Sequence, residues 1–242
     1  MFNLLLQQYF IPIIIATGPI LIWLFFFLAR DRKKPEPLYC IIAALFLGAL
    51  SAFLTVVIEF IFTNKLNITL PIIAESLAQR NLTGFIIVSI IEETMKFMVI
   101  YFLFYVNKHF NEAIDAMIYM VTAGIGFSMV ENALAVLGQL KISTSLAMPF
   151  QIIIARFLGA NLLHIICCGI IGFFWAKALV TKKNWYLGFG FISAITIHTI
   201  FNYSLYTGGV ILLPFILLFI FICATILLWM FDVVEDLRRA KI

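Results

Sequence analysis

The chain has 242 residues, of which 64% are hydrophobic and 12% are charged, and its formal net charge is +4. A water-soluble domain of this length needs a much larger polar fraction, so the composition excludes a soluble globular protein and indicates an integral membrane protein. The basic residues gather at the ends of apolar segments, so their excess reflects membrane topology, and no nucleic-acid partner is expected.

Seven apolar segments are long enough to cross a bilayer as helices, because one span needs about 20 residues. We expect an all-α, polytopic membrane bundle with about seven transmembrane helices, at 9–29, 38–62, 85–106, 116–138, 150–178, 186–206 and 210–231. Residues 1–242 are expected to form a single membrane domain. All four cysteines lie in apolar segments without a C-x-x-C pair, so no disulfide framework is expected.

The distribution of basic residues predicts the orientation, because Lys and Arg are retained on the cytoplasmic side of a membrane. Eleven basic residues follow the first, third, fifth and seventh predicted spans, and three lie on the opposite side. The eleven are Arg30, Arg32, Lys33, Lys34, Lys108, Lys177, Lys182, Lys183, Arg238, Arg239 and Lys241, and the three are Lys65, Arg80 and Lys141. We therefore expect the N-terminus outside and the C-terminus in the cytoplasm.

The third predicted span contains the segment IIEETMKF (90–97), which places Glu92, Glu93 and Lys96 among apolar residues. An ionisable side chain inside a bilayer costs about 2.5–3.5 kcal/mol on insertion scales, so it is expected to face a protein interior or a water-filled cavity. Lys96 follows the two carboxylates by four and three residues, so it can neutralise either of them. In contrast, we expect Glu59, near the end of the second span, to be interfacial or structural.

Seven further polar side chains lie in the next three predicted spans: Glu131, Asn132, Arg156, Asn161, His164, His198 and Asn202. Counted from the predicted span ends at 1.5 Å per residue, Glu92, Glu131 and His198 all lie roughly 10–12 Å below the outer surface. Gly124 and Gly126 allow a neighbouring helix to approach closely near Glu131. We therefore expect a conical polar catalytic cavity formed by the third to sixth spans, with a catalytic core at about 85–206.

Two histidines and a carboxylate, with a second carboxylate nearby, are typical of a catalytic zinc site, which uses three protein ligands and keeps one position for water. We predict that Glu131, His164 and His198 hold Zn²⁺. Glu92 would be the general base, although the pattern leaves open which of the adjacent carboxylates, Glu92 or Glu93, has this role. Lys96 would hold the other carboxylate.

The remaining polar groups have supporting roles in this interpretation. Asn202 and Asn132 would donate hydrogen bonds to the oxyanion of a tetrahedral intermediate. Asn161 shares a helix face with the histidine three residues later. Arg156 either faces the site, where it offsets a carboxylate, or extends to the membrane interface.

Two other classes of function fit the same residues. Buried Glu, His and Lys side chains also mark ion and proton pathways, so a transporter or proton relay is an alternative. A non-catalytic membrane scaffold or immunity protein that retains the constellation is another. The chain has no H-E-x-x-H motif, which excludes the ordinary zincin arrangement.

The ordered segments EETMK (92–96), GIGFSMVEN (124–132) and HTIFN (198–202), with His164 between the last two, resemble the PrsW family of intramembrane metalloproteases. This family is distantly related to CAAX prenyl endopeptidases and bacterial immunity-type membrane proteases. The resemblance implies a peptidase of the bacterial cell membrane that cuts a single-pass membrane protein, such as an anti-sigma factor, on its extracytoplasmic side. It also implies a functional set, supported by two asparagines: Glu92, Glu93, Glu131, His164 and His198, with Asn132 and Asn202.

Overall fold

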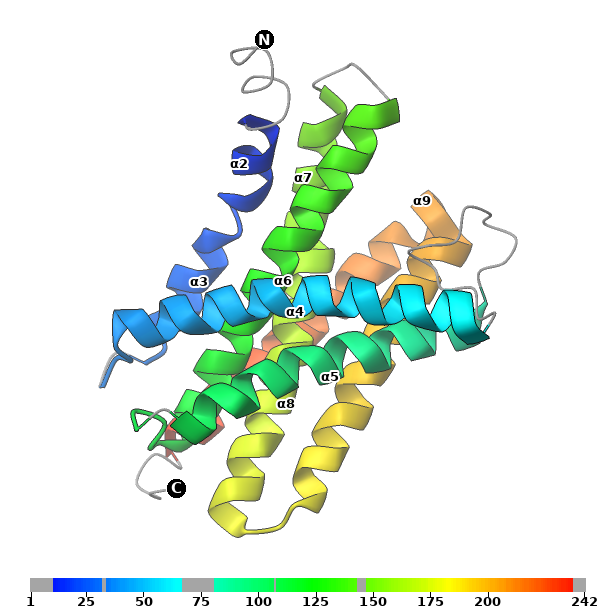
Figure 1. Cartoon of the computed structure of the whole chain (residues 1–242). Coiled ribbons are helices and arrows are strands. Elements are labelled where there is room, and N and C mark those ends of the chain that lie inside the picture. The colour runs from blue at the N-terminus through cyan, green and yellow to red at the C-terminus, as the bar shows by residue number, and fades with distance from the viewer. Residues whose placement is uncertain (1–10, 32–33, 67–80, 107, 143–146, 237–242) are drawn as a thin grey trace.

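The computed structural model describes residues 11–31, 34–66, 81–106, 108–142 and 147–236, and these residues form helices joined by short turns (Figure 1). The helices are α2 (Ile11–Thr17), α3 (Leu21–Leu28), α4 (Leu38–Leu66), α5 (Leu82–Val106), α6 (Ala113–Ile142), α7 (Ala147–Leu158), α8 (Ala160–Thr181) and α9 (Trp185–Asp236). The expected all-α bundle is confirmed.

Five stretches of the described helices are long and apolar enough to cross a membrane: Ile11–Leu28, Leu38–Ile61, Ala113–Leu140, Phe150–Thr181 and Ile211–Asp236. They correspond to the first, second, fourth, fifth and seventh predicted spans. The third predicted span is helix α5, whose length is sufficient but whose Glu92, Glu93 and Lys96 reduce its apolar character. The chain is thus a multi-pass membrane protein.

Three glycines mark breaks in the helices. Two of them interrupt a predicted span, and the third lies between two predicted spans. The first predicted span breaks between α2 and α3, where Gly18 precedes Pro19, a residue without an amide hydrogen. The fifth span breaks at Gly159, between α7 and α8. Helix α9 contains the sixth and seventh spans as two arms that meet at Gly209, whose φ of 49° favours glycine.

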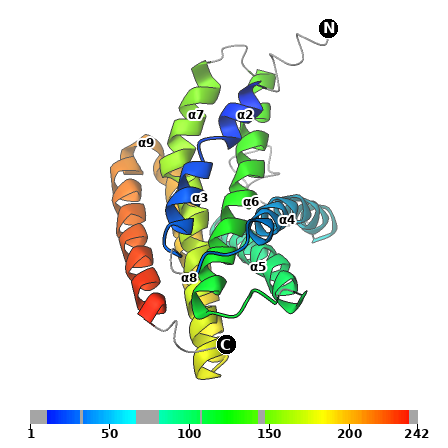
Figure 2. The ribbon, with the colours of Figure 1, turned by 90° about the vertical axis from the view of Figure 1, so that its left-hand side faces the viewer.

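Helices α6 and α8 form the centre of the bundle. Every residue from 113 to 128 in α6 and from 161 to 173 in α8 is buried. Helices α4 and α5 run side by side and cross α6 steeply (Figure 1), and the second arm of α9 lies on the opposite side of the central helices (Figure 2). The core is therefore enclosed by helices whose outer faces are left for lipid.

Close backbone contact fixes the crossing of α4 and α6. A Cβ atom on Gly48 of α4 would lie 2.1 Å from the carbonyl oxygen of Ala123, and one on Gly126 of α6 would lie 2.0 Å from that of Leu45. A Cβ atom on Gly124 would instead lie 3.0 Å from the carbonyl oxygen of His164 in α8. The close approach expected at Gly124 and Gly126 is confirmed, with one glycine on each side of α6.

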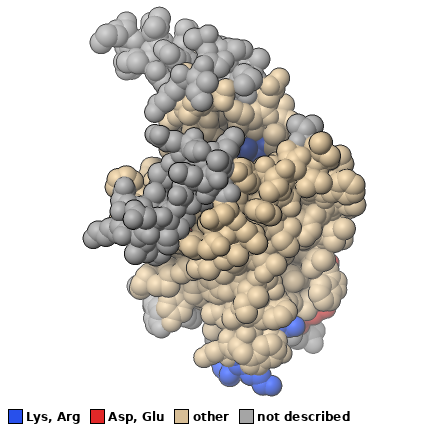
Figure 3. All heavy atoms as spheres, turned by 90° about the vertical axis from the view of Figure 1, so that its right-hand side faces the viewer, with Lys and Arg blue, Asp and Glu red and all other residues tan. Residues whose placement is uncertain are grey.

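The surface of the described residues is largely uncharged, as a bilayer requires. Figure 3 shows Lys or Arg atoms inside a hollow in the upper part of one face, and a second group of charged atoms at its foot. Large apolar side chains are exposed along α4 and the second arm of α9, including Phe46, Phe53, Phe215 and Phe221. The outer faces of these helices are therefore apolar, and the ionisable side chains predicted at the site lie inside the bundle.

Candidate active site

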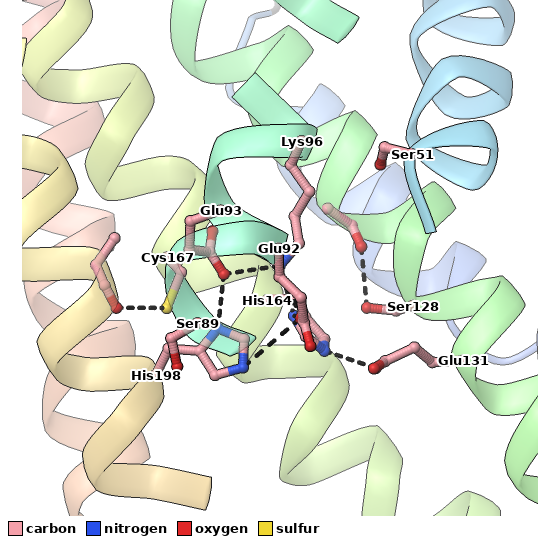
Figure 4. Close-up of polar contacts among 12 residues, drawn as sticks. Ser51, Ser89, Glu92, Glu93, Lys96, Ser128, Glu131, His164, Cys167 and His198 are labelled. Atoms are coloured by element: carbon pink, nitrogen blue, oxygen red, sulfur yellow. Dashed lines mark hydrogen bonds and ion pairs between the residues drawn. The ribbon is translucent and has the colours of Figure 1, made fainter. Parts of the chain in front are cut away.

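Five ionisable side chains from three helices meet inside the bundle (Figure 4). Helix α5 supplies Glu92, Glu93 and Lys96, helix α8 supplies His164 and the first arm of α9 supplies His198. At most 2% of the surface of any of these five residues is exposed. The structure thus brings together five residues from three segments that lie far apart in the sequence, and the chemistry of the spans predicts these residues as one group.

Lys96 connects most of this group. Its Nζ atom donates to Glu93 Oε1 at 2.7 Å, lies 3.5 Å from Glu92 Oε2, and is 2.9 Å from His164 Nδ1. It also lies 4.3 Å from the centre of the Phe127 ring, within the range of a cation–π interaction. One ammonium group therefore compensates two carboxylates and fixes an imidazole.

These contacts determine which nitrogen of each histidine carries hydrogen. An ammonium group only donates, so His164 Nδ1 accepts from Lys96, and the Nε2–H group donates to Glu131 Oε2 at 2.7 Å. His198 Nδ1 lies 2.7 Å from Glu93 Oε1 and donates to this carboxylate. The Nε2 atom of neutral His198 therefore keeps its lone pair and faces Glu92 Oε2 at 3.7 Å.

Glu92 Oε2 is buried and has no hydrogen-bond partner among the described residues. Lys96 Nζ, His198 Nε2 and His164 Nδ1 surround it at 3.5, 3.7 and 3.9 Å. These distances are too long for direct hydrogen bonds. Glu92 Oε2 thus remains available to a water molecule or a ligand.

The donor atoms of Glu92, Glu93, His164 and His198 lie within 4.8 Å of one another. Carboxylate oxygens and imidazole nitrogens are ligand types that zinc accepts, so the donor set fits a metal ion. Lys96 already binds Glu93 Oε1 and His164 Nδ1, which leaves Glu92 Oε2, Glu93 Oε2 and His198 Nε2 as donors without a direct hydrogen bond. These three atoms are the ones best placed to hold a cation.

Glu131 lies beside the far nitrogen of His164 and is not a member of this four-residue group. Its Oε2 atom also accepts from Arg156 Nη2 at 2.8 Å, and Arg156 Nε donates to Asn132 Oδ1 at 2.6 Å. Arg156 therefore faces the site and does not extend to the membrane interface. Glu131, His164 and His198 as a ligand set stay a prediction, with Glu131 placed so that it orients His164.

The predicted asparagines occupy different environments. Asn132 is buried and donates from Nδ2 to the carbonyl oxygen of Ala16 in α2 at 3.0 Å, which ties α2 to α6. Asn202 is half-buried, one turn after His198. Asn161 is buried, and its Oδ1 atom has no partner among the residues that the structure describes. The roles of Asn132 and Asn202 as oxyanion donors stay predictions.

A cavity of about 260 Å³ lies next to Glu92. Its walls come from α4, α5, α6 and α7, and it is lined by Ala52, Thr55, Val56, Glu92, Phe127, Glu131, Leu134, Ala135 and Arg156. The cavity was expected between the third and sixth spans. Its lining includes the third, fourth and fifth spans and adds the second, and no residue of the sixth span lines it. The signal in the sequence for the second span was the polar spacing Ser51, Thr55 and Glu59, four residues apart in an otherwise apolar helix.

Glu59 differs from its expected interfacial or structural position. The side chain is completely buried, and neither carboxylate oxygen has a hydrogen-bond partner in the described part of the chain. A position near the end of an apolar segment suggests contact with the interface, but the crossing of α4 over α6 turns this face inward. The interfacial position expected for Glu59 was therefore wrong, whereas a structural role stays a prediction.

The chain is similar to known proteins of one family. The model of the PrsW family intramembrane metalloproteases matches residues 36–229. The chain is 26% identical over 192 residues to Protease PrsW of Geobacillus kaustophilus, covering 78% of this chain and 77% of that protein. It is 26% identical over 207 residues to Protease PrsW of Clostridioides difficile, covering 83% and 82%. No solved structure matches the chain significantly.

The family model covers helices α4 to α8 and most of α9, which together hold every ionisable group of the site. The apolar surface and the membrane-spanning helices place these groups inside a bilayer. The chain is a hydrolase, and it belongs to the PrsW family of intramembrane metalloproteases.

Proposed function

We propose that the chain hydrolyses a peptide bond of a membrane-anchored protein, and that Glu92 activates the attacking water. The observation that carries this proposal is the environment of Glu92 Oε2, which is buried and unpartnered and faces His198 Nε2 at 3.7 Å. Both atoms are hydrogen-bond acceptors, so a water molecule that donates to both would satisfy them. Such a water is positioned between a general base and a fixed imidazole.

In the proposed reaction, the water oxygen bonds to the carbonyl carbon of the substrate while Glu92 accepts a proton from the water. Asn202, one turn from His198, donates a hydrogen bond to the oxyanion that develops on the carbonyl oxygen. When the carbon–nitrogen bond breaks, Glu92 transfers the proton to the leaving amine. Glu93 holds His198 in its tautomer throughout.

The description of the family as metalloproteases implies a metal ion, and we propose zinc. The residues that would hold it are Glu92, Glu93 and His198, with His164 next to them. With zinc bound, the ion would replace the hydrogen bonds from water to Glu92 Oε2 and His198 Nε2, and the second carboxylate oxygen of Glu92 would accept the proton. When bound, zinc supplies a Lewis acid that polarises the scissile carbonyl and lowers the pKa of water. Glu131 and Arg156 orient His164 from outside this group in the proposed arrangement, in place of Glu131 as a ligand.

We further propose that the substrate is a single-pass protein of the bacterial cell membrane, such as an anti-sigma factor, cut near the outer face of the membrane. The basic residues of the sequence support this orientation, because eleven of them follow alternate spans on one side. The site would then open toward the outer half of the bilayer. A juxtamembrane segment of an anchored protein can reach such a site without leaving the membrane.

The test is cleavage of a single-pass reporter protein in liposomes by the purified chain, with zinc content measured on the same preparations. Glu92→Gln is expected to lower cleavage by about 10²-fold or more, because an amide cannot accept the proton. It should also lose bound zinc, whereas Glu131→Gln should retain most of it. Glu235→Gln, at the far end of α9, is the matched control.

Full cleavage by Glu92→Gln would remove this residue from the mechanism. Loss of zinc in Glu131→Gln but not in Glu92→Gln would restore Glu131, His164 and His198 as the ligand set. Ion flux without any cleavage by the unmodified chain would favour a transporter, because buried ionisable chains also conduct protons.

A further inference from the structure

One face of α4 carries three buried polar residues, Ser51, Thr55 and Glu59. Residues four positions apart lie one above another on the same side of a helix, so these three form a single polar stripe. Phe53 and Phe60, on other faces of the helix, are exposed and apolar. The stripe therefore faces the interior of the bundle, where α4 crosses α6.

The members of the stripe differ in their hydrogen bonds. Ser51 Oγ donates to the carbonyl oxygen of Gly48 at 2.7 Å. Thr55 Oγ1 and both carboxylate oxygens of Glu59 have no hydrogen-bond partner among the described residues. Thr122, in comparison, donates to the carbonyl oxygen four residues earlier, as hydroxyl groups in membrane helices commonly do. Because a buried polar group without a partner is destabilising, Thr55 and Glu59 require an explanation.

The position of these two residues connects them with the active site. Thr55 lines the cavity together with Glu92 and Glu131. Glu59 lies one turn further along α4, close enough for its charge to interact with those of the same two carboxylates. Thr55 thus lies on the wall of the cavity that a substrate would occupy, and Glu59 is buried one turn beyond that wall.

The charges of this region do not balance within the described part of the chain. Glu93 is paired with Lys96 and Glu131 is paired with Arg156. No described Lys or Arg forms an ion pair with Glu59. Four carboxylates therefore face two cations. A positive charge from outside the chain would relieve this excess.

We propose that Thr55 and Glu59 form a subsite that binds a basic side chain, Lys or Arg, of the protein substrate. This inference rests on the proposed peptidase function. The ammonium or guanidinium group would donate hydrogen bonds to the two carboxylate oxygens of Glu59, and the hydroxyl group of Thr55 would bind the neighbouring peptide backbone. The subsite would select substrates that carry a Lys or Arg within the membrane, and few membrane segments carry one.

The spacing along α4 predicts where the basic residue lies in the substrate. One turn from Thr55 to Glu59 is a rise of about 6 Å. An extended peptide covers this distance in about two residues. Because the side chain adds its own reach, we expect the basic residue about two to four residues from the cleaved bond, on one fixed side.

The test uses the full chain in liposomes and a library of single-pass peptides whose residues are randomised around the membrane surface. Mass spectrometry of the products identifies the cleaved bond and its neighbours. We expect Lys or Arg to be enriched at one position two to four residues from the new terminus. Two versions of the best peptide then carry Lys or Gln at this position. Glu59→Gln should lower the ratio of kcat/KM for the Lys peptide to that for the Gln peptide about tenfold or more, since a charge-assisted hydrogen bond is lost.

Glu235→Gln is the matched control and should keep the preference for a basic residue. Cleavage by the unmodified chain without any basic preference would overturn the subsite while leaving the peptidase function intact. If Glu59→Gln lowered kcat/KM equally for the Lys and Gln peptides, the subsite would also be overturned, because a purely structural role lowers both values. Failure of the unmodified chain to cleave any peptide would instead contradict the proposed function itself.

Discussion

Lys96 is the residue on which the charge balance of the site depends. It compensates Glu93 at 2.7 Å and Glu92 at 3.5 Å, and it determines the tautomer of His164. The apolar part of its side chain belongs to the interior of the bundle, where no surface of the residue is exposed. A cation at this position is therefore a condition for burying two adjacent carboxylates in a membrane helix.

Lys96→Met is expected to destabilise the protein by about 3–5 kcal/mol, because it keeps the volume of the side chain but leaves a buried charge uncompensated. Thermal unfolding in detergent micelles measures the change. The double variant Lys96→Met/Glu93→Gln should recover most of the lost stability, since it removes the charge that lacks a partner. A single variant that melts at the temperature of the unmodified chain would show that Lys96 does not stabilise the carboxylates.

Glu36 is a second residue whose protonation matters, and it lies outside the membrane-spanning helices. Partial burial raises the pKa of its carboxyl group from 4.5 to about 7, and the neighbouring charge of Asp115 also raises it. Tyr119 of α6 donates a hydrogen bond to Glu36 Oε2 and acts in the opposite direction. The turn before α4 is thus attached to α6 by a group that titrates near neutral pH.

Because the folded state binds this proton more tightly than the unfolded state, Glu36 contributes stability that is fully present below pH 4.5. This contribution is lost as the pH rises through about 7. The expected loss is about 1 kcal/mol once solvent screening is allowed for. Glu36→Gln should reduce the fall in unfolding free energy between pH 5 and 8, measured by denaturation at each pH. An unchanged slope in this variant would assign the pH dependence to other groups.

At the scale of helices, the α4–α6 crossing decides whether the cavity exists. Gly48 and Gly126 bring the two backbones so close that an added Cβ atom would overlap a carbonyl oxygen of the opposite helix. The cavity walls Thr55 and Glu131 lie on these same two helices. Separating the helices would therefore move the wall of the cavity away from Glu92.

Gly126→Ala is expected to lower both stability and cleavage, because neither backbone can yield to an atom at 2.0 Å. Gly138→Ala is the matched control in the same helix, where an added Cβ atom meets nothing within 4 Å. This control should be slightly more stable, by about 0.5–1 kcal/mol, since alanine favours a helix. Equal melting temperatures and equal cleavage for the two variants would contradict a tight crossing.

The apolar pattern predicts the helices well but does not predict how they meet. Apolar length locates all seven expected spans within about five residues of the observed helices, since lipid imposes the same requirement on every membrane helix. The break at Gly159 was missed because the apolar pattern continues across it. The inward turn of Glu59 was missed because it depends on the crossing of α4 over α6, which glycines far apart in the sequence create.

The composition of the site was more predictable than its connections. Glu92, Glu131 and His198 were expected at similar depth. The donor atoms of Glu92 and His198 meet within 4.8 Å, together with those of Glu93 and His164. Depth does not reveal which ring nitrogen of His164 faces Lys96 and which faces Glu131, because this depends on the angle at which α8 packs against α5 and α6. The role of Glu131 is therefore an open assignment that metal binding can decide.

For the whole molecule, α6, α7, α8 and the two arms of α9 run between the upper and lower parts of Figure 1, and α4 and α5 cross them steeply. The start of α2 and the outer ends of α6 and α7 lie at the top of Figure 1, and the turn between α8 and α9 lies at the bottom. The two arms of α9 meet at Gly209. In Figure 1 the bend of α9 lies above the α8–α9 turn, and the second arm returns downward. This arrangement matches the basic residues, with Lys182 and Lys183 at the lower turn. The lower end is the one that we expect in the cytoplasm.

Single introduced cysteines test this orientation, because the four native cysteines are buried. Thr207, beside the kink of α9, is exposed, and Lys183 is exposed at the lower turn. In intact cells, a membrane-impermeant maleimide should label Thr207→Cys but not Lys183→Cys, and permeabilised cells should label both. The reverse pattern would place the C-terminus outside, and with it the positive-inside argument would fail. The cleavage site would then face the cytoplasmic half of the bilayer, where an extracytoplasmic segment of a substrate could not reach Glu92.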